Sequence, residues 1–147
     1  MALGRRRRAR IAALQALYER DTSQHEPMAV LERIAAQERL PADSIAFARA
    51  LIEGVLSQQD DIDRVIARAA PTWPLEQLAA VDRNVLRLAI REMLGDNGTP
   101  VRAVINEAVE LAKSFGSDSS ARFVNGVLGT IERQRSELRI ELAQGRG

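Results

Sequence analysis

Apolar residues recur every three or four positions along almost the whole chain, and this helical spacing is the feature that most restricts the fold. Between residues 75 and 94, for example, one long apolar face is formed by Leu78, Val81, Val85, Leu88 and Ala89. No segment has a convincing strand pattern. Hydrophobic residues make up 46% of the chain but aromatic residues only 3%, so the core must be built from Ala, Leu, Ile and Val. The sequence therefore predicts an all-α fold with closely packed helices.

Prolines and polar turns divide this pattern into a bundle of about seven helices. With 147 residues the chain is most simply one domain spanning residues 1–147. The P-T-W-P connector at residues 71–74 is rigid, because both prolines have fixed backbone angles. We expect it to form the seam between two helical subdomains that share a core. We also expect residues 1–8 and 136–147 to be flexible.

Groups that could support catalysis or bind a cofactor are sparse. The chain has no cysteine, which excludes a disulfide, a thiolate nucleophile and a Cys-ligated zinc site. The single histidine, His25, lies in a polar turn. Glu107 and Glu110 are spaced like metal ligands, but Glu110 can pair with Lys113 on an exposed face. The three aspartates in residues 60–63 are better explained as the start of a new helix than as a cation loop. We predict no enzyme activity, metal or cofactor.

The N-terminal sequence MALGRRRRARIAALQAL begins basic and then turns apolar, as a signal peptide does. Gln15, Glu19 and Arg20 interrupt the apolar part, and no cleavage site follows. Nothing approaches the ~20-residue apolar run that a membrane span requires. We therefore expect a soluble protein in the cytoplasm, without a membrane partner.

The positive charges are concentrated at the N-terminus. Residues 1–20 hold six arginines and one acidic residue, a balance of +5, whereas the remaining residues hold 15 basic and 19 acidic residues, a balance of −4. Five of these arginines form what we call the arginine tract: Arg5, Arg6, Arg7, Arg8 and Arg10. Such a distribution indicates polyanion binding. An arm that only increases solubility is the alternative for an isolated run of arginines.

The segment AVINEAVELAKSFGSDSSARFVNGVL, residues 103–128, predicts two helices joined by a polar turn. Gly116 stands where a left-handed residue usually ends a helix, and Ser117 to Ser120 can cap the next one. We call residues 116–120 the serine hinge. Gly126 costs a helix about 1 kcal/mol relative to Ala. Either a neighbouring helix or a bound chain or RNA should therefore approach it closely.

Side chains suited to nucleic acids surround the serine hinge. Lys113, Arg122 and Asn125 can contact phosphates or base edges, while Phe115 and Phe123 can stack on bases. Taken singly, the two phenylalanines are better explained as core residues at helical spacing. Together with the arginine tract, however, this set favours binding of single-stranded RNA.

Two stretches resemble the NusB family of bacterial transcription antitermination factors: the segment around KSFGSDSSARFVNG, and RRRARIAALQALYERD near the N-terminus. The resemblance continues through residues 78–94 and is loose only in residues 27–73 and after residue 132. It implies an all-α, NusB-like fold and an RNA- and protein-binding adaptor without catalytic activity. Proteins of this family bind boxA RNA of ribosomal RNA transcripts together with NusE, a small-subunit ribosomal protein, within the RNA polymerase antitermination complex.

Carried onto this chain, the resemblance implies two sets of contact residues. Those on the RNA side are Arg5, Arg6, Arg7, Arg8, Arg10, Gln15, Tyr18, Lys113, Phe115, Ser117, Arg122 and Phe123. Those on the NusE side are Asp82, Arg83, Arg87, Glu107 and Glu110.

Two other functions remain open at this point. A similar helical domain precedes the catalytic part of certain ribosomal RNA cytosine methyltransferases, so the chain could be a stand-alone module of that kind. A DNA-binding helical protein would instead carry its basic side chains along an exposed recognition helix, whereas here they crowd at one terminus. Comparing single-stranded RNA with duplex DNA in a binding assay separates these alternatives.

Overall fold

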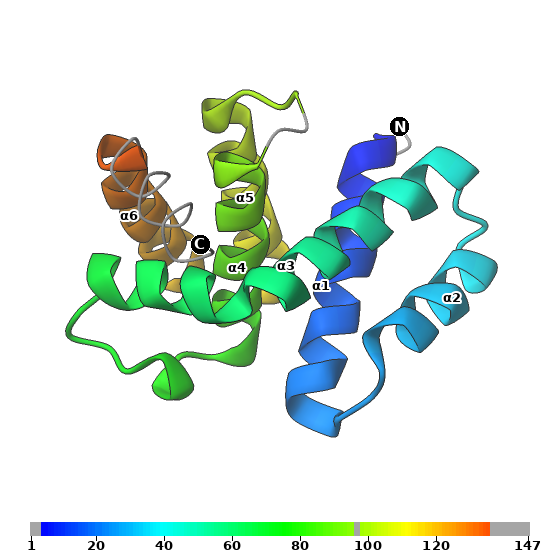
Figure 1. The fold of residues 1–147 in the computed structure, drawn as a ribbon, viewed down its shortest axis with the longest axis horizontal. Coiled ribbons are helices and arrows are strands. Elements are labelled where there is room, and N and C mark those ends of the chain that lie inside the picture. The colour runs from blue at the N-terminus through cyan, green and yellow to red at the C-terminus, as the bar shows by residue number, and fades with distance from the viewer. Residues whose placement is uncertain (1–3, 96–97, 136–147) are drawn as a thin grey trace. The chain divides into compact units, whose positions relative to one another are not determined.

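The computed structural model describes residues 4–95 and 98–135, and within these ranges it is built from helices and their connections (Figure 1). The elements are α1 (Arg5–Ser23), α2 (Pro27–Gln37), α3 (Ala42–Ala69), the 3-10 helix η1 (Leu75–Gln77), α4 (Ala80–Leu94), α5 (Val101–Phe115) and α6 (Ser120–Arg133). The all-α prediction is confirmed, with six α-helices and one 3-10 turn in the described residues. None of these helices is long and apolar enough to cross a membrane.

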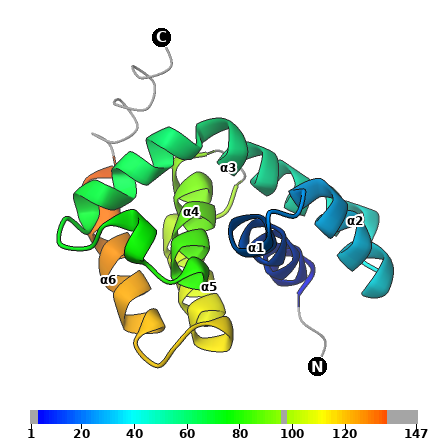
Figure 2. The ribbon, with the colours of Figure 1, turned by 90° about the horizontal axis from the view of Figure 1, so that it is seen from below.

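The chain forms two compact units, of which the first spans Met1–Ser57. It contains α1, α2 and the first part of α3, and α1 lies beside α2 (Figures 1 and 2). The buried face of α1 is rich in alanine, with Ala9, Ala13 and Ala16 fully buried. Small side chains let the neighbouring helices approach closely, so the aromatic-poor composition suits this packing.

The second unit spans Gln58–Gly147 and contains the end of α3, η1 and α4 to α6. Helices α4, α5 and α6 pack against one another in pairs (Figure 2). Its largest fully buried side chains are aliphatic or thioether groups: Ile62, Ile66, Leu86, Ile90, Met93, Ile105, Leu128 and Ile131. The unit is therefore held mainly by aliphatic burial, worth roughly 1.5–3 kcal/mol for each large side chain.

The division between the units falls at Ser57–Gln58, whereas the sequence suggested residues 71–74. Helix α3 runs through the aspartates that were expected to begin a new helix, and it bends at Gln58, whose φ of −118° and ψ of 17° are not helical. Two of the predicted helices are thus one helix, α3, so the described residues hold one α-helix fewer than expected. The P-T-W-P connector instead lies inside the second unit and leads into η1. Its prolines interrupt a helix without dividing a core.

The expectation of flexible ends also changes. Arg5 to Arg8 form the first turns of α1 and are not a separate arm. Residues 136–147 lie outside the described part of the chain.

Candidate nucleic-acid interface

The arginine tract opens helix α1. Gly4 is the N-cap residue and makes no side-chain cap, and the first turn holds no acidic residue. The positive end of the helix dipole and the free backbone N–H groups there attract anions, and a cation at that end is unfavourable. Several arginines at this end therefore repel one another and the positive end of the helix dipole. A bound phosphate would reduce this repulsion.

Contacts from neighbouring segments hold the ends of the tract. Arg5 Nη1 donates to Asp43 Oδ2 at 3.0 Å, and Ser44 Oγ donates to the Arg5 carbonyl oxygen at 3.2 Å. Arg8 Nη2 donates to the Glu38 carbonyl oxygen at 2.7 Å. The Arg5 hydrogen bond lowers the pKa of the Asp43 carboxyl. Since each guanidinium has five N–H donors, both arginines keep donors for other acceptors.

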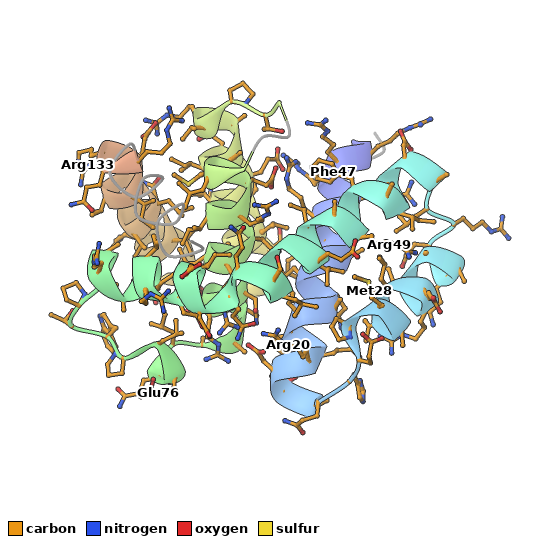
Figure 3. The ribbon with its side chains drawn as sticks, viewed as in Figure 1. Arg20, Met28, Phe47, Arg49, Glu76 and Arg133 are labelled. Carbon is orange, nitrogen blue, oxygen red and sulfur yellow. The ribbon has the colours of Figure 1, made fainter. Side chains whose placement is uncertain are left out.

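Phe47 on α3 supports the middle of the tract (Figure 3). The guanidinium carbon of Arg6 lies 4.8 Å from the centre of its ring and that of Arg10 lies 5.2 Å away, which is cation–π distance. Arg10 is only 5% exposed, so its side chain is mainly part of the fold. Phe47 was not predicted from the sequence. The available signal was its i,i+4 spacing from Asp43, which places both on one helix face.

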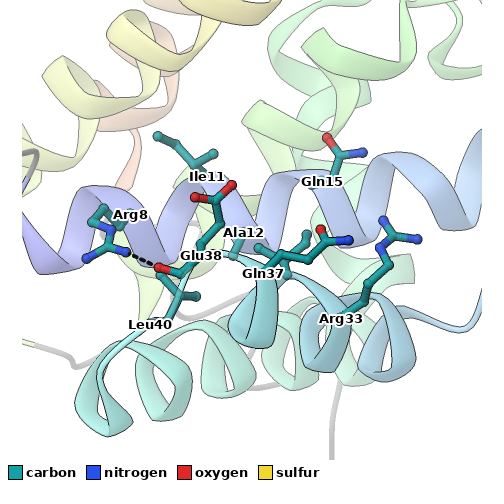
Figure 4. A pocket seen from close by; sticks show the side chains of 9 residues that line it. Arg8, Ile11, Ala12, Gln15, Arg33, Gln37, Glu38 and Leu40 are labelled. Carbon is teal, nitrogen blue, oxygen red and sulfur yellow. Dashed lines mark hydrogen bonds between the residues drawn. The ribbon is translucent and has the colours of Figure 1, made fainter.

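An open groove of about 400 Å³ lies between α1 and α2 in the first unit (Figure 4). The groove is lined by Arg8, Ile11, Ala12, Gln15, Arg33, Ile34, Gln37, Glu38 and Leu40. Arg8 and Gln15 thus belong both to the predicted RNA set and to this groove. Tyr18, one turn beyond Gln15, is 36% exposed, so its ring is accessible for stacking.

Glu19 is the hub of a hydrogen-bond cluster beside the groove. Its Oε2 accepts from Gln15 Nε2 at 2.7 Å and from Arg33 Nη2 at 2.6 Å. Its Oε1 lies 2.8 Å from His25 Nδ1. The hydrogen bonds from Arg33, Gln15 and His25 lower the pKa of Glu19 to about 2. Glu19 is therefore a carboxylate at all physiological pH values. Its role at this site was not predicted from the sequence.

The serine hinge lies in the second unit and differs in detail from its prediction. Ser120 Oγ is buried and accepts from the Ser117 backbone N–H at 2.9 Å. Ser119 is the N-cap of α6 but makes no side-chain cap. Ser117 Oγ also lies 3.2 Å from Ser120 Oγ and 3.4 Å from Ser119 Oγ. The serines of the hinge thus bond to one another, and the Ser120 hydroxyl accepts the one backbone hydrogen bond.

The structure explains the glycines at positions 116 and 126 differently from the sequence-based expectation. Gly116 has an extended backbone, with φ of −98°, and is not left-handed. A Cβ there would lie 2.4 Å from Ser120 Oγ and 2.8 Å from the Ala112 carbonyl oxygen, so close packing requires glycine. Gly126 is exposed, and nothing lies within 4 Å of a Cβ built on it. In the described residues no neighbouring helix approaches it.

Most predicted RNA contacts of the hinge face solvent. Lys113 and Arg122 are exposed, with Lys113 Nζ 3.5 Å from Glu110 Oε1. Phe115 is 47% exposed, although its helical spacing suggested a core position, whereas Phe123 is half-buried. An exposed phenylalanine can stack on a base. The hinge set and the arginine tract belong to different units.

One residue assigned to the protein side is unsuitable for it. Arg87 is 5% exposed and forms a bidentate pair with Asp63, with Nε–Oδ1 and Nη2–Oδ2 distances of 2.9 and 3.0 Å. Its Nη1 also donates to Asn84 Oδ1 at 3.1 Å. We correct that assignment: Arg87 connects the end of α3 to α4 in the interior. The assignment was carried over from the family resemblance and took no account of the Asp63 partner on α3.

The other residues of the protein side are more accessible. Arg83 is half-buried and donates to the Leu78 carbonyl oxygen at 3.1 Å. Asp82 is half-buried in the first turn of α4, and its Oδ1 is buried without a hydrogen bond in the described residues. Glu107 is half-buried and Glu110 is exposed, both on α5.

The fold and its first helix together define an all-α protein with a concentrated basic surface. A family model described as the NusB family matches residues 7–133. The transcription antitermination protein NusB of Chloroflexus aggregans (strain MD-66 / DSM 9485) is 53% identical over 128 residues, which cover 86% of this chain and 85% of that protein. The chain belongs to the NusB family of transcription antitermination proteins.

Solved structures agree with this assignment. NusB of T. maritima superimposes with a TM-score of 0.83 at 36% identity, covering 91% of this chain and 94% of that chain. A structure of the antitermination factors NusB and NusE in complex with double-stranded RNA gives a TM-score of 0.79 at 25% identity, covering 88% and 96%. The resemblance inferred from sequence is confirmed. Family membership also confirms the prediction that the chain is not an enzyme.

Proposed function

We propose that this chain is an RNA- and protein-binding adaptor that binds single-stranded boxA RNA of ribosomal RNA transcripts together with NusE. In this role it joins the RNA polymerase antitermination complex in the cytoplasm and supports ribosomal RNA synthesis and maturation. Family membership and the related structure with NusE and RNA support the class of function.

The observation that carries the RNA assignment is the position of the arginine tract. Its positive charges stand at the positive end of α1, where they are unfavourable in the free protein. Arg5 and Arg8 are nevertheless held in place by single hydrogen bonds that leave further donors available. A phosphate backbone would stabilise this arrangement through charge-assisted hydrogen bonds.

The remaining RNA contacts provide sequence selectivity, which phosphate contacts lack. Backbone contacts give affinity without sequence choice, and bases are read by stacking and by polar edges. We assign Tyr18 and Phe115 to stacking because both rings are exposed. Lys113, Ser117 and Arg122 are exposed around the hinge and supply polar contacts there.

For the protein side we retain Asp82, Arg83, Glu107 and Glu110. The chain beyond residue 20 carries a balance of −4. A basic ribosomal protein is attracted to such a surface, whereas RNA is attracted to the arginine tract. The two partners therefore need different surfaces of the same chain.

The test is a titration of the full chain with fluorescein-labelled single-stranded boxA-like RNA, the same sequence as duplex RNA, and the same sequence as duplex DNA. We expect the single strand to bind most tightly, because its bases are open to stacking. Equal affinities for all three would reduce the interface to a general basic surface. Tightest binding of duplex RNA would overturn the assignment to single strands.

The adaptor role requires a second titration, of RNA with and without saturating NusE. If NusE also touches the RNA, the two partners should reinforce each other by about 1–3 kcal/mol, reciprocally. Asp82→Lys should weaken NusE binding and leave RNA binding by the isolated protein unchanged. Identical RNA affinities with and without NusE would contradict the adaptor mechanism.

A further inference from the structure

The turn between α2 and α3 carries an arginine in an uncommon backbone conformation. Arg39 has a φ of 50°, in the left-handed region, and its side chain is exposed. We propose that Arg39 binds a phosphate of the RNA strand that contacts the arginine tract, so that the interface extends from α1 onto this turn. This inference rests on the proposed RNA binding and adds a contact that neither the arginine tract nor the serine hinge includes.

The local fold explains why residue 39 is left-handed but not why it is an arginine. The Leu40 backbone N–H donates to the Ala35 carbonyl oxygen at 3.0 Å, and Leu40 is buried. This bond defines a Schellman ending of α2, in which the residue before the final donor is left-handed. Glycine is usual there, because a Cβ makes that conformation less favourable. An arginine therefore makes the turn less stable than a glycine would, which points to a use for its side chain.

The described part of the chain does not use that side chain. Within it, the Arg39 guanidinium makes no hydrogen bond or ion pair, although Glu38 precedes it in sequence. Arg5 and Arg8 of the tract, by contrast, each have a partner in the fold. A guanidinium has five N–H donors and no acceptor, so Arg39 presents its donors to an anionic ligand.

Arg39 also lies next to the arginine tract, and both belong to the first unit. Arg8 Nη2 donates at 2.7 Å to the Glu38 carbonyl oxygen, which belongs to the peptide bond that precedes Arg39. The Arg39 Cα is therefore within about 6 Å of the Arg8 guanidinium nitrogen. Four residues further along the chain, Asp43 contacts Arg5. The turn thus runs alongside the tract.

A phosphate bound at Arg8 is within reach of the long Arg39 side chain. Guanidinium groups bind phosphate oxygens through paired N–H donors, and such contacts add affinity without choosing a base. Arg8 and Arg39 come from different segments of the first unit. A strand held by both is therefore fixed across α1 and not only along it.

The first test separates the charge of Arg39 from its backbone conformation. Gln24, at the end of α1, is a second exposed residue with a positive φ, 55°, so this chain already holds a glutamine in that conformation. Arg39→Gln should keep the fold and weaken binding of fluorescein-labelled single-stranded boxA-like RNA by about fivefold. The slope of log K against log salt should become shallower by about 0.7, the contribution of one phosphate. Arg39→Lys keeps the charge and should recover most of the affinity.

The matched control for the charge is Arg49→Gln. Arg49 is another exposed arginine of the first unit without a partner in the described residues. It follows Phe47, whose ring faces the tract, by two residues, and two residues turn a helix by about 200°. Arg49 thus points away from the tract. Its variant should leave the affinity and the salt slope unchanged.

A pair of glycine variants tests the argument from backbone conformation. Arg39→Gly and Gln24→Gly should both raise the melting temperature of the full chain, because glycine suits the left-handed region. Only Arg39→Gly should weaken RNA binding. A protein that melts higher and binds RNA less tightly cannot have lost the contact by unfolding.

The phosphate itself can be located with a set of RNAs that each carry one neutral methylphosphonate linkage. At one linkage, the loss of affinity measured with the unchanged chain should be absent in Arg39→Gln. Both changes remove the same contact, so their effects should not add.

The outcomes distinguish this inference from the function on which it rests. Absence of binding to any RNA overturns both. Binding by Arg39→Gln that is as tight and as salt-dependent as that of the unchanged chain overturns the Arg39 contact alone. An equal loss in Arg49→Gln also overturns it, because net charge would then be the cause. A lower melting temperature of Arg39→Gly would contradict the argument from backbone conformation.

Discussion

Arg5 of α1 and Arg87 of α4 look alike in sequence but have opposite roles. In α1, the Arg5 side chain is 68% exposed and pairs with an equally accessible Asp43. In α4, the Arg87 side chain is 6% exposed and satisfies Asp63 and Asn84 in the interior. Both helices place an arginine against an aspartate of α3. The difference is the environment, which decides whether a guanidinium is available to a ligand or committed to the fold.

The comparison shows that burial separates arginines that stabilise the fold from arginines that are available to a ligand. Buried pairs use up the charge in the free protein, since neither partner can return to water without disrupting the core. Exposed pairs are exchangeable, because water and salt compete for both partners. A phosphate can therefore replace Asp43 at Arg5, whereas no ligand can replace Asp63 at Arg87.

The largest effect should come from breaking the buried side of this comparison. Arg87→Ala leaves the Asp63 carboxylate and the Asn84 amide without their partner. We expect a loss of about 3–5 kcal/mol in the free energy of unfolding. Urea denaturation followed by circular dichroism measures it. Arg5→Ala is the matched control and should cost less than about 1 kcal/mol. Equal losses in the two variants would refute the distinction.

The exposed side is tested through RNA affinity. On a single strand, each neutralised phosphate contributes about −0.7 to the slope of log K against log salt. If about four arginines engage, raising the salt fourfold should weaken binding roughly 50-fold. Replacing Arg5 to Arg8 with alanine should flatten this slope and leave helicity unchanged. Fluorescence anisotropy at several salt concentrations gives the slope.

The control for that variant removes the same number of charges elsewhere. Four exposed arginines outside the tract serve this purpose: Arg49, Arg64, Arg102 and Arg133. Their replacement by alanine should leave most of the slope in place. If the control flattens the slope as much as the tract variant does, net charge is the cause and the tract has no special position.

Much of the fold was predictable, because a helix with one apolar face buries that face in the core. The apolar face of residues 78–89 predicted α4, whose Val85 and Leu88 are buried. The boundary between the units was not predictable from prolines. It depends on the bend at Gln58, a polar residue that the helix buries and that accepts from Arg91 Nη1 at 2.7 Å. Such a tertiary contact leaves no local sequence signal.

The candidate site was predictable in composition but not in arrangement. Charge clustering identified the arginine tract, since charge is readable from sequence alone. Phe47 was missed because its partners, Arg6 and Arg10, lie 37 to 41 positions away. Two partners of Glu19 are local, but Arg33, the first cause of its lowered pKa, lies 14 positions away. Arg87 was misassigned for the same reason. Spacing gives the face of a helix, whereas the partner decides the role.

In the serine hinge, the same comparison of a buried with an exposed group applies to two neutral side chains, Ser120 and Ser119. Ser120→Ala removes the buried acceptor of the Ser117 backbone N–H. We expect a loss of about 1 kcal/mol in the free energy of unfolding, because a backbone donor is left unsatisfied. Ser119→Ala removes an exposed hydroxyl that makes no cap, and its effect should stay within about 0.5 kcal/mol. Thermal melting of both variants measures the difference. A greater loss for Ser119 would reassign the cap.

The smallest expected effect concerns Gly126, a position where the fold of the free protein does not require glycine. Gly126 lies in the middle of α6 with open space around a built Cβ, so Gly126→Ala should stabilise the free protein by about 0.4–1 kcal/mol. The same variant reports on binding, because a partner that approaches the bare backbone would meet the new methyl group. Weaker RNA or NusE binding by a more stable protein would mark Gly126 as a contact point that sacrifices stability for close approach. Gly129→Ala is the control on the same helix, where a Cβ meets Arg133 Nη1 only at an ordinary 3.8 Å. Should Gly126→Ala destabilise the free protein instead, the open surroundings of this glycine would be contradicted.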